Sequence, residues 1–256
     1  MNSESILSIP PPKADERLHY GSDPQQFADL RLPSGKGPHP ILVFLHGGFW
    51  RAKYDLTHAG HLCAALTAKQ VATWNMEYRR VGNSGGGWPG TFEDITNGLR
   101  FVSWIAHRYG LDVKRIVIMG HSAGGQLALA LAAHQHSIRH AVSLAGVVDL
   151  QRAFELHLSN DAVVDFMGGS PQQVPEHYHE ASPLDLPMPR VRQLLVHGDE
   201  DDTVPVTLSR TYRDAKLKRG EKVGFLELPK SGHYELIDPR SSAWPAVQEK
   251  TLELLA

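Results

Sequence analysis

A chain of 256 residues is long enough to bury about three quarters of its unfolded surface as one globular domain. Its formal net charge of −2, with 21% charged residues, supplies no field that would attract nucleic acid or an anionic membrane. The single cysteine, Cys63, excludes an intrachain disulfide and a cysteine-based zinc cluster. The N-terminal sequence lacks the basic start and apolar core of a signal peptide, so we expect a cytoplasmic protein.

Strand patterns recur along most of the chain. Residues 1–18 include Pro10-Pro-Pro12 and are expected to form a tail, whereas residues 26–33 alternate apolar and polar side chains as an exposed strand does. Continuous apolar runs follow, of the kind found in strands buried on both faces of a parallel sheet. These predicted buried strands are residues 40–45, 71–76, 115–119, 140–145, 192–197 and 223–228.

Helical patterns lie between the predicted strands, at residues 58–69, 92–109, 123–134, 207–219 and 245–255. Strands that alternate with helices predict right-handed crossovers and one doubly wound, mostly parallel sheet with helices on both faces. We therefore expect a single α/β domain spanning residues 1–256. Only residues 149–190, which are rich in proline, break the alternation, and we expect them to form a short lid-like insertion above the sheet edge.

One short motif lies where a predicted strand meets a predicted helix. Gly120-His-Ser-Ala-Gly124 fits the pattern G-x-S-x-G, which on composition alone arises by chance in roughly one chain in ten of this length. The context makes the match specific, because a nucleophilic serine at a strand-to-helix turn adopts a strained backbone and needs small neighbours on both sides. Ser122 is therefore the candidate nucleophile.

A serine hydroxyl near pH 7 needs a base within hydrogen-bond reach and an acid that orients the base. Folds with this turn place the acid and then the histidine after the serine in the chain. His233 follows the last predicted strand and is the candidate base. The preceding loop holds Asp199, Asp201 and Asp202, and Asp149 follows another strand, so residue reasoning alone leaves the acid open.

These motifs together resemble the α/β-hydrolases, and within them the branch of kynurenine formamidases and small carboxylesterases that carry a His-Gly-Gly-aromatic-Trp motif. The resemblance covers nearly the whole chain and rests on His46-Gly-Gly-Phe-Trp50, Gly120-His-Ser-Ala-Gly-Gly125, residues 197–205 (His-Gly-x-x-Asp-x-x-Val-Pro) and His233. It implies Ser122 as nucleophile, His233 as base and Asp201 as acid, with Asp202 as the alternative.

The glycine pair after residues 40–45 frees backbone amides to point toward the nucleophile. We expect an oxyanion hole formed by the amides of Gly48 or Phe49 together with that of Ala123. His46 is expected to orient this loop without transferring protons. Three aromatic residues beside the motifs are candidates for the substrate pocket: Trp50, Trp88 and Tyr234. Trp88 is equally compatible with a loop anchor packed on the core.

The sequence thus predicts two-step acyl transfer on small carboxylic esters or N-formyl and aryl amides, without a metal or organic cofactor. The resemblance points to N-formylkynurenine or a small ester as substrate. An exopeptidase of the prolyl-oligopeptidase type is the alternative enzyme, and a catalytically silent binding module is the alternative of another class. The expected partner is a small molecule and neither nucleic acid nor a membrane; a homodimer is compatible with the sequence, which does not specify the oligomeric state.

Overall fold

The structure is a computed structural model that describes residues 3–256, and these residues build one eight-stranded sheet. Its order is β1-β2-β4-β3-β5-β6-β7-β8. β1 and β4 pair antiparallel with β2, and the pairs from β4 to β8 are parallel. The strands are β1 (Glu16–His19), β2 (Phe27–Arg31), β3 (His39–Leu45), β4 (Ala72–Met76), β5 (Leu111–His121), β6 (His140–Leu144), β7 (Arg192–Gly198) and β8 (Val223–Leu228).

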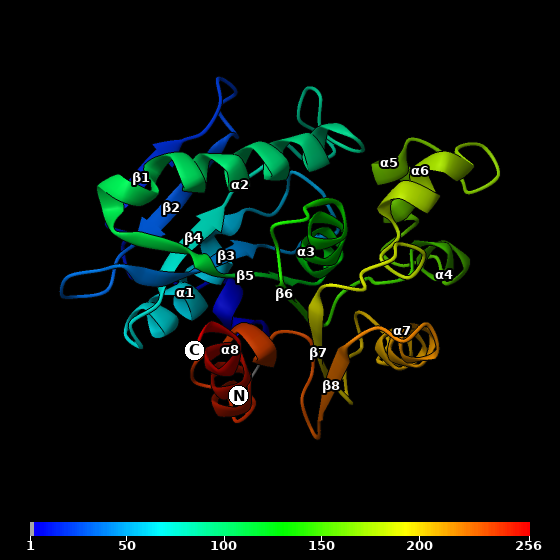
Figure 1. Ribbon diagram of the computed structural model, residues 1–256. Coiled ribbons are helices and arrows are strands. Elements are labelled where there is room, and N and C mark those ends of the chain that lie inside the picture. The colour runs from blue at the N-terminus through cyan, green and yellow to red at the C-terminus, as the bar shows by residue number, and fades with distance from the viewer. Residues whose placement is uncertain (1–2) are drawn as a thin grey trace.

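Helices cover both faces of the sheet (Figure 1). Side chains from α2, α3 and α7 join one buried apolar cluster, and side chains from α1 and α8 join a second cluster on the opposite face. The predicted α/β fold with a mostly parallel sheet is therefore confirmed. The helices are α1 (Gly60–Thr67), α2 (Gly90–Tyr109), α3 (Ala123–His134), α4 (Leu150–Glu155), α5 (Ala162–Met167), α6 (Pro175–Ala181), α7 (Thr207–Lys218) and α8 (Trp244–Leu255), with 3₁₀ turns η1 (Ser3–Leu7), η2 (Leu56–Ala59) and η3 (Glu235–Ile237).

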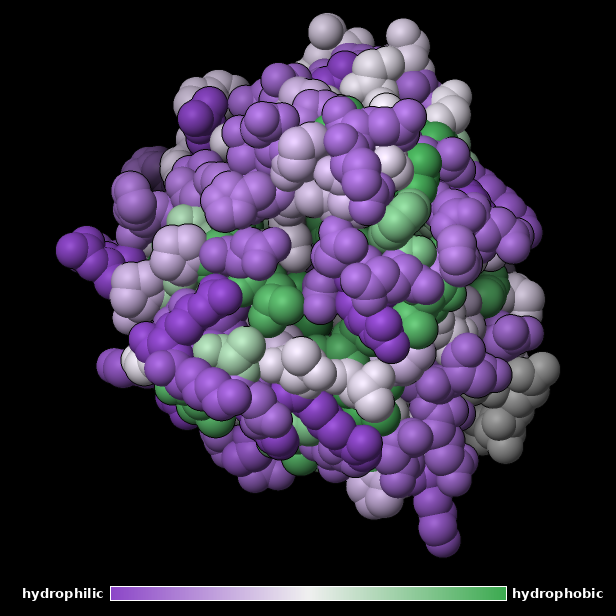
Figure 2. All heavy atoms as spheres, turned by 90° about the vertical axis from the view of Figure 1, so that its right-hand side faces the viewer, coloured by the Kyte–Doolittle hydropathy of each residue, from purple (hydrophilic) through white to green (hydrophobic). Residues whose placement is uncertain are grey.

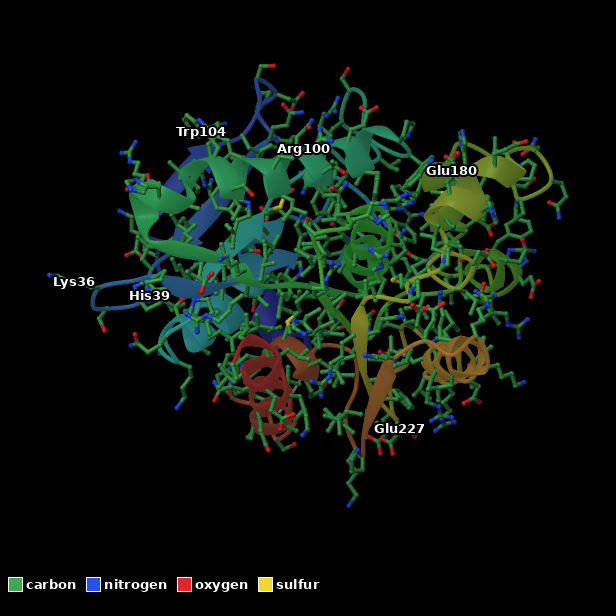
Figure 3. The ribbon with its side chains drawn as sticks, in the orientation of Figure 1. Lys36, His39, Arg100, Trp104, Glu180 and Glu227 are labelled. Atoms are coloured by element: carbon green, nitrogen blue, oxygen red, sulfur yellow. The ribbon has the colours of Figure 1, made fainter. Side chains whose placement is uncertain are left out.

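Helix α2 illustrates how the sequence places a helix on the sheet. Its buried residues Ile95, Leu99 and Val102 recur at helical spacing on one side. Arg100 and Trp104 lie on the outer side, away from the sheet (Figure 3). The helix ends where Gly110 adopts a left-handed conformation with φ 61° and donates its amide to Ala106 O, a conformation that glycine reaches without steric cost.

Three predictions in the first part of the chain differ from the structure. Residues 16–18 of the expected tail, together with His19, form β1, which sequence patterning misses because this four-residue edge strand is mostly exposed. The predicted strand at residues 26–33 appears as β2, yet it is largely buried, because β1 and β4 pair with it on either side. The start of the expected helix at residues 58–69 becomes η2, where the Asp55 carboxylate caps the amide of Thr57.

Residues 149–190 leave the sheet between β6 and β7 and carry α4, α5 and α6. In Figure 1 these three helices lie together at the side toward which β3 and β5 run. Lys36 and His39 lie on the opposite side of the molecule, and Glu180 of α6 lies in the insertion (Figure 3). The extent of the domain and the use of the insertion as a lid stay predictions. No helix within residues 3–256 has the length and apolar character needed to cross a membrane.

Candidate active site

Ser122 occupies the turn between β5 and α3 in a strained backbone conformation, with φ 56° and ψ −123°. Two glycines make this turn sterically feasible. A β-carbon on Gly120 would lie 1.9 Å from Gly124 O, and one on Gly124 would lie 2.0 Å from Leu45 O. The strain is held by the sheet, because the Ser122 amide donates to Leu144 O of β6 at 2.8 Å. Any residue larger than glycine at either position would push the turn open.

The side chains of His233 and Asp201 contact each other, although the two residues follow different strands, which are neighbours in the sheet. His233 Nδ1 donates to Asp201 Oδ2 at 2.7 Å, and both side chains are buried. The loop after β7 fixes the carboxylate, since Asp201 Oδ1 accepts the amides of Thr203 at 2.9 Å and Val204 at 2.8 Å. This arrangement leaves the other nitrogen of His233, Nε2, free to serve as a base.

A second histidine, which sequence reasoning did not single out, also contacts the carboxylate. His197 Nε2 lies 3.2 Å from Asp201 Oδ2 and 2.8 Å from Val204 O. Burial by itself would raise the pKa of Asp201, yet hydrogen bonds from His197 and His233 outweigh burial and hold that pKa well below its usual range. Asp201 therefore stays ionised. Asp202 is exposed on its side of the loop and accepts a hydrogen bond from Thr203 Oγ1 at 3.1 Å.

Ser122 and His233 line one small cavity of about 150 Å³. The oxyanion-loop candidates Gly48 and Phe49 line it too, as does the pocket candidate Tyr234. Figure 2 looks onto the side of the molecule that carries α4 to α7 and shows hydrophobic residues set back between mostly hydrophilic ones. Sequence reasoning did not single out the remaining lining residues, because no local pattern marks them as part of a pocket: Leu7, Tyr54, His58, His121, Ser159 and Thr203.

Two of these residues are buried histidines that stay neutral. Burial, followed by repulsion from His46, lowers the pKa of His58 to about 3. Burial, followed by repulsion from His233, holds the pKa of His121 well below its usual value. His121 Nε2 donates to His233 O at 3.0 Å, which leaves Nδ1 as an unpartnered acceptor. Two neutral imidazoles thus border the cavity beside the candidate base.

The loop after β3 has three successive residues with positive φ: Gly48 at 116°, Phe49 at 48° and Trp50 at 56°. Within residues 3–256 the amides of Gly48, Phe49 and Ala123 donate no hydrogen bond to other protein groups. Free amides at a strained turn and at the first residue of a helix are suited to bind a developing negative charge. The expected oxyanion hole stays a prediction that this geometry favours.

His46 is fully buried and holds the start of this loop. Its Nδ1 bonds Gly47 O at 2.8 Å, and its Nε2 bonds Glu77 Oε1 at 3.0 Å. Its own carbonyl accepts the Tyr78 hydroxyl at 2.6 Å. Since both ring nitrogens are engaged by the protein and His46 does not line the cavity, the geometry favours the expected orienting role.

The structure corrects the expectation that Trp50 shapes the pocket. Trp50 is 1% exposed, stacks on Phe166 with ring centres 4.6 Å apart, and donates its indole N–H to Gln126 Oε1 at 3.0 Å. Trp50 therefore belongs to the buried core, and it does not line the cavity that contains Ser122. Trp88 packs on Phe92 with ring centres 5.0 Å apart and does not line the cavity, as expected for a loop anchor.

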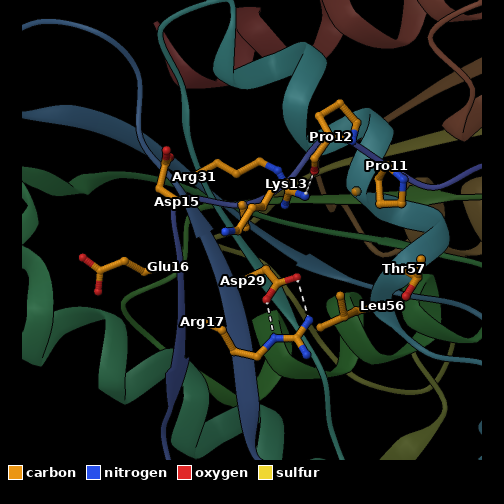
Figure 4. Close-up of a pocket in the computed structure, with 12 residues that line it drawn as sticks. Pro11, Pro12, Lys13, Asp15, Glu16, Arg17, Asp29, Arg31, Leu56 and Thr57 are labelled. Atoms are coloured by element: carbon orange, nitrogen blue, oxygen red, sulfur yellow. Dashed lines mark hydrogen bonds and ion pairs between the residues drawn. The ribbon is translucent and has the colours of Figure 1, made fainter.

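A larger pocket of about 320 Å³ lies elsewhere, between residues 11–17 and β2 (Figure 4). Its wall includes Arg17, which forms two hydrogen bonds with Asp29 at 2.7 and 3.0 Å. None of the candidate catalytic residues lines it. Within residues 3–256 no group of three or more histidine, cysteine or acidic side chains could hold a metal ion. The candidate chemistry therefore concentrates in the small cavity at Ser122.

Comparison with known proteins places the chain among hydrolases of this fold. It is 26% identical to esterase LipC of Mycobacterium tuberculosis over 87% of this chain and 60% of that protein. It is 27% identical to the isoprenylcysteine alpha-carbonyl methylesterase ICME of Arabidopsis thaliana over 85% of this chain and 56% of that protein. A kynurenine formamidase of Meyerozyma guilliermondii is 23% identical over 77% of this chain and 78% of that protein. The chain thus spans little more than half of the first two relatives.

Solved structures support the same fold. A truncated carbohydrate esterase from gut microbiota superposes with a TM-score of 0.83 at 20% identity, over 96% of this chain and 99% of that one. Esterase B from Lactobacillus rhamnosis superposes with a TM-score of 0.80 at 18% identity, over 99% and 88%. The BD-FAE family model matches residues 28–215, which include β2 to β7 and the serine turn. The chain therefore belongs to the BD-FAE family of α/β-hydrolases.

Proposed function

We propose that this chain is a serine hydrolase that cleaves small carboxylic esters or N-formyl and aryl amides through an acyl-enzyme. The observation that carries the proposal is the position of His233, whose Nδ1 is held by the ionised Asp201 while its ring borders the same cavity as Ser122. A histidine oriented by a carboxylate beside a serine on a strained turn is the arrangement that activates a hydroxyl.

In the proposed reaction Ser122 Oγ attacks the carbonyl carbon while His233 takes the hydroxyl proton. The negative charge that forms on the carbonyl oxygen is received by the amide of Ala123 and those of Gly48 or Phe49. When the tetrahedral intermediate collapses, His233 gives its proton to the leaving alcohol or amine. Water then attacks the acyl-enzyme, passes a proton to His233, and the acid leaves as Ser122 regains its hydrogen.

The size and polarity of the cavity support small substrates. A space of about 150 Å³ bordered by His58, His121 and Tyr234 suits a short acyl or formyl group better than a long lipid chain. The names of the relatives agree with this range, since they include esterases, a methylesterase and a kynurenine formamidase. A cytoplasmic location and action on a small molecule belong to the same proposal.

Replacement of Ser122 by alanine tests the nucleophile. We expect kcat/KM for p-nitrophenyl acetate to fall by about 10⁵-fold or more, because the covalent route is lost. Ser137→Ala is the matched control, since it removes the hydroxyl of an exposed serine that does not line the cavity. A fluorophosphonate probe should label the wild-type chain and Ser137→Ala but not Ser122→Ala. Labelling or turnover that survives in Ser122→Ala would refute the proposal.

The substrate class is tested by comparing kcat/KM for N-formylkynurenine, short p-nitrophenyl esters and aminoacyl anilides under one set of conditions. We expect turnover of the formamide or of the short esters to exceed that of the anilides by at least tenfold. Preferred cleavage of the anilides would instead favour the exopeptidase alternative. Absence of probe labelling in the wild-type chain would favour the silent binding module.

A further inference from the structure

The N-terminal turn η1 reaches the candidate active site and places an apolar side chain there. Leu7, the last residue of η1, lines the same cavity as Ser122 and His233. It is 37% exposed, and among residues 3–256 only three other large hydrophobic side chains are as exposed: Trp104, Val113 and Leu217. Single exposed hydrophobic residues are common on protein surfaces, so the position of Leu7 beside the nucleophile is what gives it meaning.

The segment around Leu7 is fixed to the body of the protein on both sides. Ile6 is fully buried in the apolar cluster beneath α1 and α8. Ser5 Oγ accepts a hydrogen bond from Arg240 at 3.1 Å, and Ile9 O lies 3.0 Å from His61 Nε2. Further on, Arg31 donates to Pro12 O at 2.9 Å. Leu7 is therefore held in place between anchors and forms a fixed wall of the cavity.

The same turn borders a second hollow on its other side. Glu4 lines a space of about 260 Å³ together with Asp202, His233 and Tyr234. Burial, followed by repulsion from Tyr54 and Glu4, raises the pKa of Tyr234 to about 12, which agrees with η1 lying close to this tyrosine. His233 and Tyr234 border both hollows, and η1 contributes Leu7 to the cavity that contains Ser122 and Glu4 to the other hollow.

We propose that Leu7 is a specificity-determining residue that limits the size of the substrate group bound beside Ser122. The inference rests on the proposed ester hydrolysis and deepens it: the preferred substrates carry a short group on the side of the cavity that faces η1. Because η1 is anchored by Ile6, Ser5 and Ile9, a longer group meets a fixed leucine and is excluded.

Three variants test this inference. Leu7→Ala should enlarge the cavity beside Ser122, and Leu7→Trp should reduce it. Ile6 keeps η1 anchored in both variants. Leu217→Ala is the matched control, because it truncates a leucine that is 50% exposed on α7 and does not line the cavity. One substrate series lengthens the acyl chain of p-nitrophenyl esters from acetyl to octanoyl. A second series lengthens the alcohol of acetate esters.

In Leu7→Ala we expect kcat/KM for the long members of at least one series, relative to acetate, to rise about tenfold over wild type. In Leu7→Trp the same ratio should fall, and in Leu217→Ala it should not change. Unchanged ratios in both series for both Leu7 variants would overturn the role of Leu7. Fluorophosphonate labelling distinguishes failure of this inference from failure of the proposed function. Labelling at Ser122 together with unchanged kcat/KM ratios in the Leu7 variants would refute only this inference. Absence of labelling in the wild-type chain would refute the proposed function.

Discussion

At the scale of single residues, the loop after β7 decides which carboxylate serves the candidate base. Asp201 and Asp202 are adjacent in the sequence and chemically identical. Two backbone amides and two histidines fix the Asp201 side chain in a buried position, whereas the Asp202 side chain is exposed. A buried carboxylate that accepts four hydrogen bonds remains ionised and keeps the imidazole of His233 in one tautomer.

Replacement of each aspartate by asparagine separates the two. In Asp201→Asn the amide can donate to His233 Nδ1 and stabilise the wrong tautomer, so we expect kcat for a short p-nitrophenyl ester to fall about 10⁴-fold. Asp202→Asn should stay within about twofold of wild type, because the Asp202 charge is exposed and screened by solvent and its carboxylate does not bond His233. Equal losses in both variants would contradict the assignment of Asp201.

At the scale of elements, helix α3, which follows Ser122, joins the loop after β3 to the insertion. Gln126 of α3 accepts the indole N–H of Trp50 at 3.0 Å and donates to Ala181 O of α6 at 2.8 Å. Phe166 of α5 stacks on the Trp50 ring. On the surface, Arg51 donates to Ser159 Oγ at 3.3 Å. The strained loop is therefore held from both α3 and the insertion.

A double-mutant cycle measures this connection. Gln126→Leu leaves the Trp50 indole and the Ala181 carbonyl without partners, and we expect a loss of about 1–3 kcal/mol in the free energy of unfolding. Trp50→Phe removes the indole N–H while keeping an aromatic ring against Phe166. The double variant should lose about 1 kcal/mol less than the sum of the two single losses, as measured by urea unfolding. Strict additivity would mean that the two side chains do not act together.

At the scale of the whole molecule, burial of neutral histidines makes stability depend on pH. The pKa of His58 is lowered to about 3 by burial, whereas in the unfolded chain it returns to about 6.5. As the pH falls below about 6.5, His58 becomes protonated in the unfolded state but stays neutral in the folded state. The stability from neutral His58 is therefore complete above about pH 6.5 and is lost as the pH falls toward 3. His121 acts in the same direction.

The free energy of unfolding between pH 7 and pH 5 tests this effect. His58→Asn removes the titrating group, so its loss of stability over that interval should be about 2 kcal/mol smaller than that of the wild-type chain. His107→Asn, at an exposed position on α2, is the control and should follow the wild-type curve. An identical pH dependence in His58→Asn and wild type would show that His58 is not kept neutral by the fold.

Several features could be predicted from the sequence because their signals are local. The strand, the two small residues and the helix around Ser122 lie within about 20 consecutive residues, and the predicted helix at residues 123–134 agrees with α3. The predicted strand at residues 223–228 likewise agrees with β8. In contrast, the buried side of Trp50 depends on Gln126, 76 residues away, and aromatic character alone could not distinguish pocket from core.

By itself, the sequence determined the α/β fold, the serine turn and the chain order of the candidate nucleophile, acid and base. Hydrophobic periodicity and turn-forming residues act over a few positions, so both can be recognised directly in the sequence. Only the tertiary structure decided that Asp201 and not Asp202 faces His233, that Trp50 lies in the core, and that Leu7 reaches the cavity. Those outcomes depend on packing between segments far apart in sequence, for which no local pattern exists.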